Sequence, residues 1–120
     1  MRKISRKGLN KKLTAIIRER VVLRDENICQ HCGKYVTGSN CQVSHVIPKS
    51  QGNILRWDLN NLKILCYHCH LNWWHKNPTE ASEWFKSKFP ERYEYLQEHK
   101  NDIRILKDFH IQEMIDSLKT

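Results

Sequence analysis

Apolar side chains near the start of the chain recur at the spacing of an amphipathic helix. Leu13, Ile16, Ile17 and Val21 lie three or four positions apart in most cases, with charged residues among them. This is the period of a helix that buries one face, so the sequence predicts a helix over about residues 10–25. The polar, basic residues 1–12 contain glycine and asparagine and are expected to form a flexible arm.

The middle of the chain carries a strand pattern. Residues 41–47 are rich in β-branched side chains and stop at Pro48, which predicts a strand followed by a loop over residues 48–58. Residues 60–65 lead into a second short helix, expected to begin near Cys66 and to end before Pro78.

The last third of the chain is predicted to be helical. Pro78 and Pro90 each stand at the beginning of a segment with helical periodicity, a position that proline favours. A last helix is expected to begin at Asn101 or Asp102. Its apolar stripe would consist of Ile103, Leu106, His110, Met114 and Leu118. Helices on both sides of a small β element predict an α+β fold.

Length and composition limit the chain to one small domain. It has 120 residues, of which 39% are hydrophobic, and so thin a core usually needs a staple. We expect a single domain over residues 13–120, with its core at 27–78 and a helical tail at 79–120. No apolar run approaches the ~18 residues of a membrane span, and no apolar segment follows the basic N-terminus as in a secretory signal. We therefore expect a cytoplasmic protein with no membrane partner.

Positive charge is concentrated at one end of the chain. The formal net charge is +8, and residues 1–24 hold nine basic side chains and one acidic one, while the remainder is balanced. Such a segment can bind nucleic acid without reading its sequence, because each neutralised phosphate releases counterions. The alternative interpretation is a solvated tail that only aids solubility.

Two Cys-x2-Cys pairs predict a structural zinc site. Cys29 and Cys32 form one pair, and Cys66 and Cys69 form the other. Four thiolates suit one tetrahedral Zn²⁺ and leave no open coordination position for catalysis. A redox role fits poorly, since there are two pairs and no βαβ pattern. Cys41 is left over and is expected to be a small buried strand residue.

Three further polar residues are not needed for a structural zinc. His45 lies in the predicted strand, Asn61 precedes the second cysteine pair, and His70 directly follows the last cysteine. With the segments CQHC, VSHVIP, NNLKILC and CYHCH, this pattern resembles the HNH (ββα-metal) endonucleases from residue 29 to about 75. A looser likeness, in IIRER, LRWDLNN and the tail at 81–96, is to the NinG (Rap) recombination nucleases of lambdoid phages.

The resemblance implies a zinc-stapled ββα-metal core, flanked by N- and C-terminal helices, that hydrolyses DNA phosphodiester bonds in a bacterial or phage-infected cell. In that family pattern His45 would be the general base that activates water. Asn61 would orient the loop that carries His45, a role suited to an amide. His70 would bind the catalytic ion, which stabilises the phosphate and the leaving oxygen.

One position departs from the family pattern. Ser44 stands where the family often has Asp or His as a second metal ligand, and the only carboxylate between residues 27 and 79 is Asp58. Asp58, a glutamate of the helical tail or several waters could complete a site for Mg²⁺ or Mn²⁺, with Ni²⁺ or Zn²⁺ left open because imidazole suits softer ions. The alternative function is a non-catalytic, zinc-stabilised nucleic-acid-binding protein on the same fold, which Ser44 favours.

DNA would be recognised by its backbone and shape, because the sequence contains nothing like a helix-turn-helix or another base-reading module. This favours branched or junction DNA with low sequence specificity. Junction cutting would suit a homodimer, with the stripe on the last helix as its interface, although core packing is the commoner use of such a stripe. His75, five residues after His70, could be a further metal ligand or could contact phosphate, but exposed helix surface is its expected place. The predicted DNA contacts are Arg2, Lys3, Arg6, Lys7, Lys11, Lys12, Arg56 and Trp57.

Overall fold

The computed structural model describes residues 4–49 and 54–119. Arg2 and Lys3, two of the predicted DNA contacts, lie outside these residues. Two strands and several helices give the α+β fold that the sequence predicts. In chain order the elements are α1 (Arg6–Asp25), η1 (Gly38–Asn40), β1 (Gln42–His45), η2 (Leu59–Asn61), β2 (Leu62–Leu65), η3 (His68–Trp74), α2 (Pro78–Lys88), α3 (Pro90–His99) and α4 (Asp108–Leu118).

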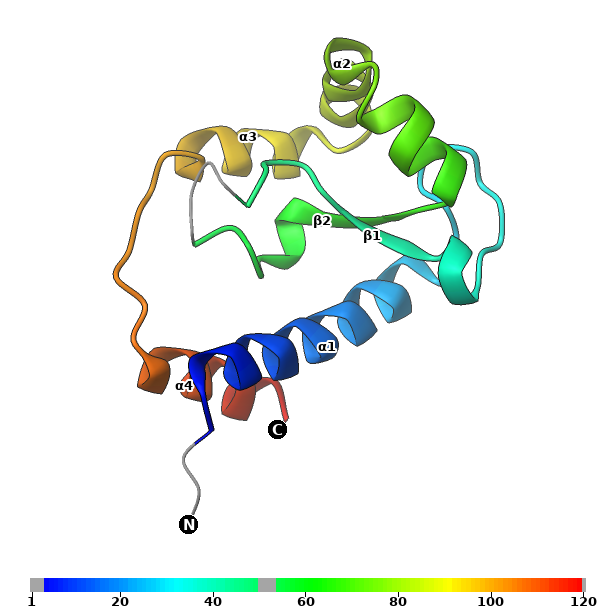
Figure 1. Ribbon diagram of the computed structural model, residues 1–120. Coiled ribbons are helices and arrows are strands. Elements are labelled where there is room, and N and C mark those ends of the chain that lie inside the picture. Colours follow the sequence, from blue (N-terminus) through cyan, green and yellow to red (C-terminus); the bar gives the residue numbers. More distant parts are fainter. Residues whose placement is uncertain (1–3, 50–53, 120) are drawn as a thin grey trace.

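A two-stranded antiparallel hairpin lies at the centre of the molecule. Strands β1 and β2 pair with Ser44 opposite Lys63 and His45 opposite Leu62. Helix α1 runs along one side of the hairpin, whereas α2 and α3 cover the other (Figure 1). A hairpin of this length is marginal alone in water, so it depends on the helices that cover it.

Helix α1 begins earlier than the periodicity predicts. Ser5 accepts a hydrogen bond from the backbone N–H of Gly8, as an N-cap residue does, and the helix starts at Arg6. Residues 6–12 of the expected flexible arm are therefore helical. The helix ends where Glu26 adopts a left-handed conformation with φ of 56°. None of the helices in the described residues has the length and apolar character needed to cross a bilayer.

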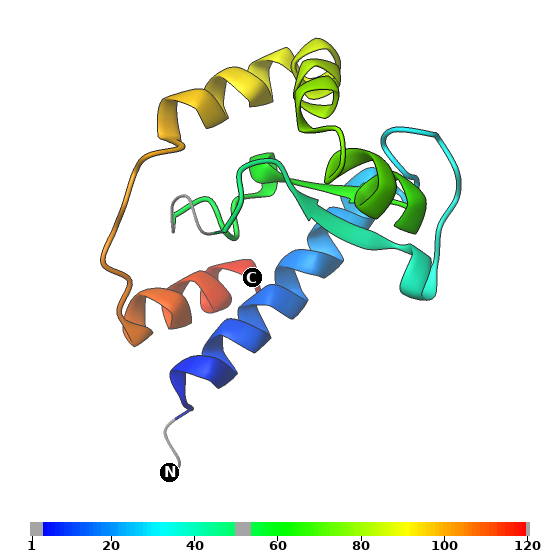
Figure 2. The same cartoon turned by 45° about the horizontal axis from the view of Figure 1, so that its top comes forward.

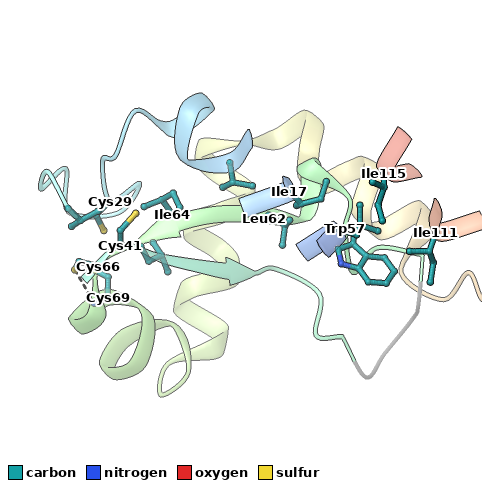
Figure 3. Close-up of a cluster of buried hydrophobic side chains, with 14 of the residues drawn as sticks. Ile17, Cys29, Cys41, Trp57, Leu62, Ile64, Cys66, Cys69, Ile111 and Ile115 are labelled. Atoms are coloured by element: carbon teal, nitrogen blue, oxygen red, sulfur yellow. Dashed lines mark hydrogen bonds between the residues drawn. The ribbon is translucent and has the colours of Figure 1, made fainter. Parts of the chain in front are cut away.

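The core consists of two clusters of buried side chains. The larger one lies between α1, the hairpin and α4, and Figure 3 shows it running from Trp57, Ile111 and Ile115 to the cysteines at the other end of the hairpin. The smaller cluster packs α2 and α3 against the loop that follows β1. Its buried members are Ile47, Leu55, Phe85 and Leu96.

The last helix differs from the prediction. It begins at Asp108 rather than near Asn101, and its buried residues are Ile111 and Ile115. Ile103, which was expected to start the apolar stripe, is 81% exposed. The buried face of α4 packs against α1 within the same chain (Figure 2). Of the two uses considered for the stripe, core packing is the one that the structure shows, because Leu106, Met114 and Leu118 pack against the core cluster.

The end of α3 explains this shift. Asp102 does not cap a new helix, because its carboxylate accepts a hydrogen bond from the ring of His99 and its backbone N–H bonds the His99 carbonyl. Residues 102–107 then cross from α3 to α1 in a non-helical conformation (Figure 1). An extended chain covers about twice the distance per residue that a helix does. The residues expected to start the last helix therefore form the extended connection instead.

The packing of α4 predicts a large cost for shortening Ile115. Ile115→Ala should lower the free energy of unfolding by about 2–5 kcal/mol, because the side chain is fully buried and its loss leaves a cavity. The matched control is Ile105→Ala, since Ile105 is 81% exposed; it should change stability by less than ~0.5 kcal/mol. Urea denaturation followed by circular dichroism measures both. Equal effects would show that α4 is not docked on α1.

Candidate functional site

The four predicted zinc ligands come together at one end of the hairpin. Cys29 and Cys32 follow α1, and Cys66 and Cys69 lie at the junction of β2 and η3. Their Sγ atoms all lie within 4.8 Å of one another, and Figure 3 labels three of the four, Cys29, Cys66 and Cys69. Sulfurs around one tetrahedral Zn²⁺ are about 3.8 Å apart, so the cluster can hold a zinc ion with small adjustments.

Backbone and ring groups surround these sulfurs with hydrogen bonds. The N–H of Cys32 donates to Cys29 Sγ, and the N–H of Cys69 donates to Cys66 Sγ. His31 Nδ1 lies 3.3 Å from Cys69 Sγ, and its ring stacks on Trp73 at a centroid distance of 3.5 Å. A ring N–H at this place stabilises a thiolate. The sequence carries no sign of this role, because His31 and Trp73 meet only through the fold.

His45 is positioned as a base by the loop that follows β1. Its Nε2 lies 3.0 Å from the carbonyl oxygen of Arg56. A carbonyl only accepts, so Nε2 carries the proton and Nδ1 keeps its lone pair. Burial is the largest influence on His45 and lowers its pKa, which favours the neutral ring. His45 therefore has the protonation state that a general base needs near neutral pH.

Asn61 closes the loop between the two strands. Its side chain is fully buried, accepts from the N–H of Ile47 at 2.7 Å, and donates to the carbonyls of Ile47 and Leu55 at 3.0 and 3.1 Å. Leu55 directly precedes Arg56, whose carbonyl holds the ring of His45. Asn61 thus fixes both ends of the segment that orients His45.

His70 lies in the π-helix η3, and His75, the residue that directly follows η3, faces it. Their Nε2 atoms are 3.2 Å apart, and His70 Nδ1 lies 2.7 Å from Gln42 Oε1 on β1. Because an amide oxygen accepts, the lone pair of His70 is on Nε2, the atom that faces His75. Burial, followed by the nearby His75, lowers the pKa of His70 to about 4. Two imidazole nitrogens on one tetrahedral zinc are about 3.3 Å apart, so this pair can hold a metal ion.

The residue before His45 points away from this pair. Successive strand residues face opposite sides of a sheet, and Ser44 is fully buried. Its Oγ accepts a hydrogen bond of 3.0 Å from Lys63 Nζ, which lies 3.3 Å from the centroid of the Trp74 ring. Burial lowers the pKa of Lys63 well below its usual value. Ser44 is therefore committed to a buried polar contact.

His45 and His70 line one cavity of about 480 Å³. It lies between α1, β1 and the loop before η2, and three cations also line it: Arg18, Lys49 and Arg56. A second hollow of about 600 Å³ adjoins it and is lined by His45, His70 and His75. The three histidines therefore face connected space that a phosphodiester can enter.

Asp58 and Trp57 do not occupy the positions expected of them. One oxygen of Asp58 accepts from the N–H of Asn60 and caps η2, and the other accepts from the Tyr95 hydroxyl at 2.5 Å. Among the described residues, only the four cysteines form a group of three or more ligands around one position. Trp57 is 7% exposed and donates from Nε1 to Thr14 Oγ1. Asp58 is thus a cap rather than a metal ligand, and Trp57 is a core residue rather than a base-stacking one.

Comparison with known proteins agrees with this geometry. The HNH endonuclease family model matches residues 29–73. The matched segment includes all four cysteines, His45, Asn61 and His70, and it ends two residues before His75. No curated protein and no solved structure matches the chain. The segment is thus similar to nucleases that use a divalent metal. The four cysteines within it form a cluster that can hold a zinc ion.

Zinc analysis tests the cysteine cluster. The purified protein should contain one zinc per chain by mass spectrometry, and removal of zinc by a strong chelator should unfold it, because a metal that binds only the folded state adds its binding energy to stability. Cys66→Ala should lose both the zinc and the fold. Cys41→Ala should keep the zinc, since Cys41 is outside the cluster. Retention of zinc by Cys66→Ala would contradict the assignment.

Substitution of Asn61 should lower the free energy of unfolding far more than substitution of an exposed asparagine. Asn61→Asp removes the amide donor and places a carboxyl group against two buried carbonyls, so the free energy of unfolding should fall by at least about 1–3 kcal/mol. Asn101→Asp, at an exposed position, is the control and should have little effect. Urea unfolding compares the two variants. A small loss at Asn61 would show that the loop does not depend on this amide.

Proposed function

We propose that the chain is a metal-dependent endonuclease that hydrolyses DNA phosphodiester bonds at the cavity lined by His45 and His70. The observation that carries the proposal is the orientation of His45. Its Nε2 is held by the Arg56 carbonyl and its Nδ1 is left as the basic atom. The cavity that it faces also contains His70 and three cations, and the adjoining hollow is lined by both His70 and His75. A structural zinc domain needs none of these groups.

His45 would accept the proton of the attacking water at Nδ1 as the water adds to phosphorus. Its neutral state favours this step, because a protonated ring has no lone pair. Arg56 would hold the ring through its carbonyl and face the phosphate with its guanidinium, since its side chain lines the same cavity. Asn61 acts through the loop and does not touch substrate.

His70 and His75 would hold the catalytic ion, a pair that replaces the predicted pair of His70 and Asp58. When bound, the ion supplies positive charge for the phosphate and the leaving oxygen. Two imidazoles without a carboxylate favour Mn²⁺, Ni²⁺ or Zn²⁺ over Mg²⁺. Gln42 would orient His70 through Nδ1 and so keep Nε2 free for the metal.

The substrate that we propose is branched or junction DNA, cut with little sequence specificity. Support comes from the cations around the site and from the likeness of residues 81–96 to the NinG nucleases. The alternative function, a nucleic-acid-binding protein without catalysis, is favoured by one observation. Ser44 is buried on Lys63, so the position that often supplies a metal ligand in HNH nucleases supplies none here.

A nicking assay separates the two functions. Supercoiled plasmid and a four-way junction are incubated with the protein in Mg²⁺, Mn²⁺, Ni²⁺ or EDTA. The wild type should cleave in at least one metal and not in EDTA, and His45→Ala should lower the rate by about 10²–10⁴-fold, the usual contribution of a general base. His68→Ala, at an exposed histidine of the same helix as His70, is the control and should retain activity.

The metal dependence tests His75 separately. His75→Ala should raise the metal concentration needed for half-maximal cleavage, while the rate at saturating metal changes less. Cleavage that survives His45→Ala would refute the assigned base. Binding of DNA without cleavage in every metal would establish the non-catalytic alternative.

A further inference from the structure

The cations of α1 do not form one uniform basic surface. Several are engaged in contacts within the fold on the side of the helix that faces α4. Arg6 pairs with Asp108 at 3.1 Å, and Arg20 donates to the Leu118 carbonyl. Lys12 lies beside Lys119, which lowers its pKa. Arg6 and Arg20 therefore take part in the contact between α1 and α4, and Lys12 lies close to the positive charge of Lys119.

A second group of polar residues lies on another side of α1. At about 100° per residue, Lys7, Lys11, Thr14 and Arg18 fall within an arc of about 60° around the helix axis, and all four are exposed. Lys12 lies about 100° beyond Lys11. Figure 2 shows α4 packed beside α1, and the exposure of these four side chains indicates that α4 leaves this arc uncovered.

Two hollows join these residues to the candidate active site. One is lined by Arg6, Lys7, Asn10, Lys11, Thr14 and Arg56. The other is the cavity that contains His45 and His70, and it shares Thr14 and Arg56 with the first. Among the described residues that line the two hollows, none is an aspartate or glutamate. The path from Lys7 to His45 is therefore cationic and has no carboxylate to repel a phosphate.

Two of the residues on this path are fixed in place. Arg18 donates from Nη2 to the Cys41 carbonyl at 2.7 Å, just before β1, and this leaves its other N–H groups for a ligand. The Arg56 guanidinium lies 4.7 Å from the centroid of the Trp57 ring, and Trp57 is itself bonded to Thr14. The junction of the two hollows is thus built on the core rather than on freely moving side chains.

We propose that Lys7, Lys11, Arg18 and Arg56 form a track for the sugar-phosphate backbone of one DNA strand, which runs along α1 into the His45 cavity. This inference rests on the proposed nuclease function and adds the path of the substrate strand. The helix rise separates Lys7 from Lys11 by about 6 Å and Lys11 from Arg18 by about 10 Å, so the track spans several phosphates beyond the one that is cut. Lys12, which was grouped with the predicted DNA contacts, lines neither hollow, and Arg6 lines the first hollow but is paired with Asp108.

The slope of DNA affinity against salt concentration tests the track. Affinity is measured by fluorescence anisotropy with a labelled 30-nucleotide single strand and with the corresponding duplex, in EDTA so that nothing is cut. Each lost phosphate contact lowers the slope of log K against log salt by about 0.7 for single strands and about 0.9 for duplex. The double variant Lys7→Gln, Lys11→Gln should therefore lower it by about 1.4 and 1.8, and Arg56→Gln by about half as much.

The matched control removes the same charge from the other side of α1. The double variant Lys12→Gln, Lys119→Gln should keep the wild-type slope, and melting curves confirm that both double variants are folded. An equal loss in the control would replace the track by a diffuse charge effect and overturn the inference. A loss with duplex alone would overturn the assignment to a single strand.

Failure of the track and failure of the nuclease proposal give different results. If the Lys7, Lys11 variant binds like the wild type while His45→Ala abolishes cleavage, the nuclease stands and the track is wrong. If the wild type neither binds nor cleaves DNA in any metal, both are wrong. Normal cleavage of short oligonucleotides by the Lys7→Gln, Lys11→Gln variant, together with slower cleavage of long ones than by the wild type, would support the inference independently.

Discussion

The arrangement of this molecule depends on the four cysteine sulfurs that converge at one end of the hairpin. One pair ends the segment that follows α1, and the other joins β2 to η3. A zinc ion held by all four would tie the long basic helix to η3, which carries His70 and is followed by His75. The core of so small a chain is thin, and structural zinc contributes about 10–16 kcal/mol of binding energy in comparable peptides. Metal–sulfur bonds would then add to the apolar packing that already holds α1 against the hairpin.

One face of the hairpin is buried and the other is accessible to solvent. Successive residues of β1 therefore alternate between the two environments. Ser44 faces the dry side, where Lys63 reaches it beneath Trp74, while His45 faces the cavity. A carboxylate at position 44 would form an ion pair with a buried lysine instead of binding a catalytic metal. The serine is therefore matched to its partner across the hairpin. In the function that we propose, the second metal ligand would come from another element, and His75 lies 3.2 Å from His70 Nε2.

The sequence predicts those features that depend on residues only a few positions apart. The two Cys-x2-Cys pairs predict the cluster that the structure shows, and the fold class is confirmed. Contacts over longer distances could not be foreseen. The burial of Trp57 depends on Thr14, 43 positions earlier, and Asp58 is taken up by Tyr95 on a distant helix. The start of α4 depends on how far the chain must travel after α3. His75 is exposed as expected, but its contact with His70 depends on the π-helical turn, which the sequence pattern does not reveal.

The π-helical turn of η3 has a consequence for how this pair of histidines can vary. Five positions separate His70 from His75, and the hydrogen bond from the His75 N–H to the His70 carbonyl spans the same interval, so both rings emerge on one side. In an α-helix the same juxtaposition needs a separation of four. Deletion of one exposed residue between them, such as Leu71 or Asn72, would convert the π-helical turn into an α-helical turn. The two histidine rings would then still lie side by side. Two chains with this architecture can therefore differ in length by one residue at this turn. If their sequences were aligned without a gap there, His75 would be matched to a residue other than the equivalent histidine.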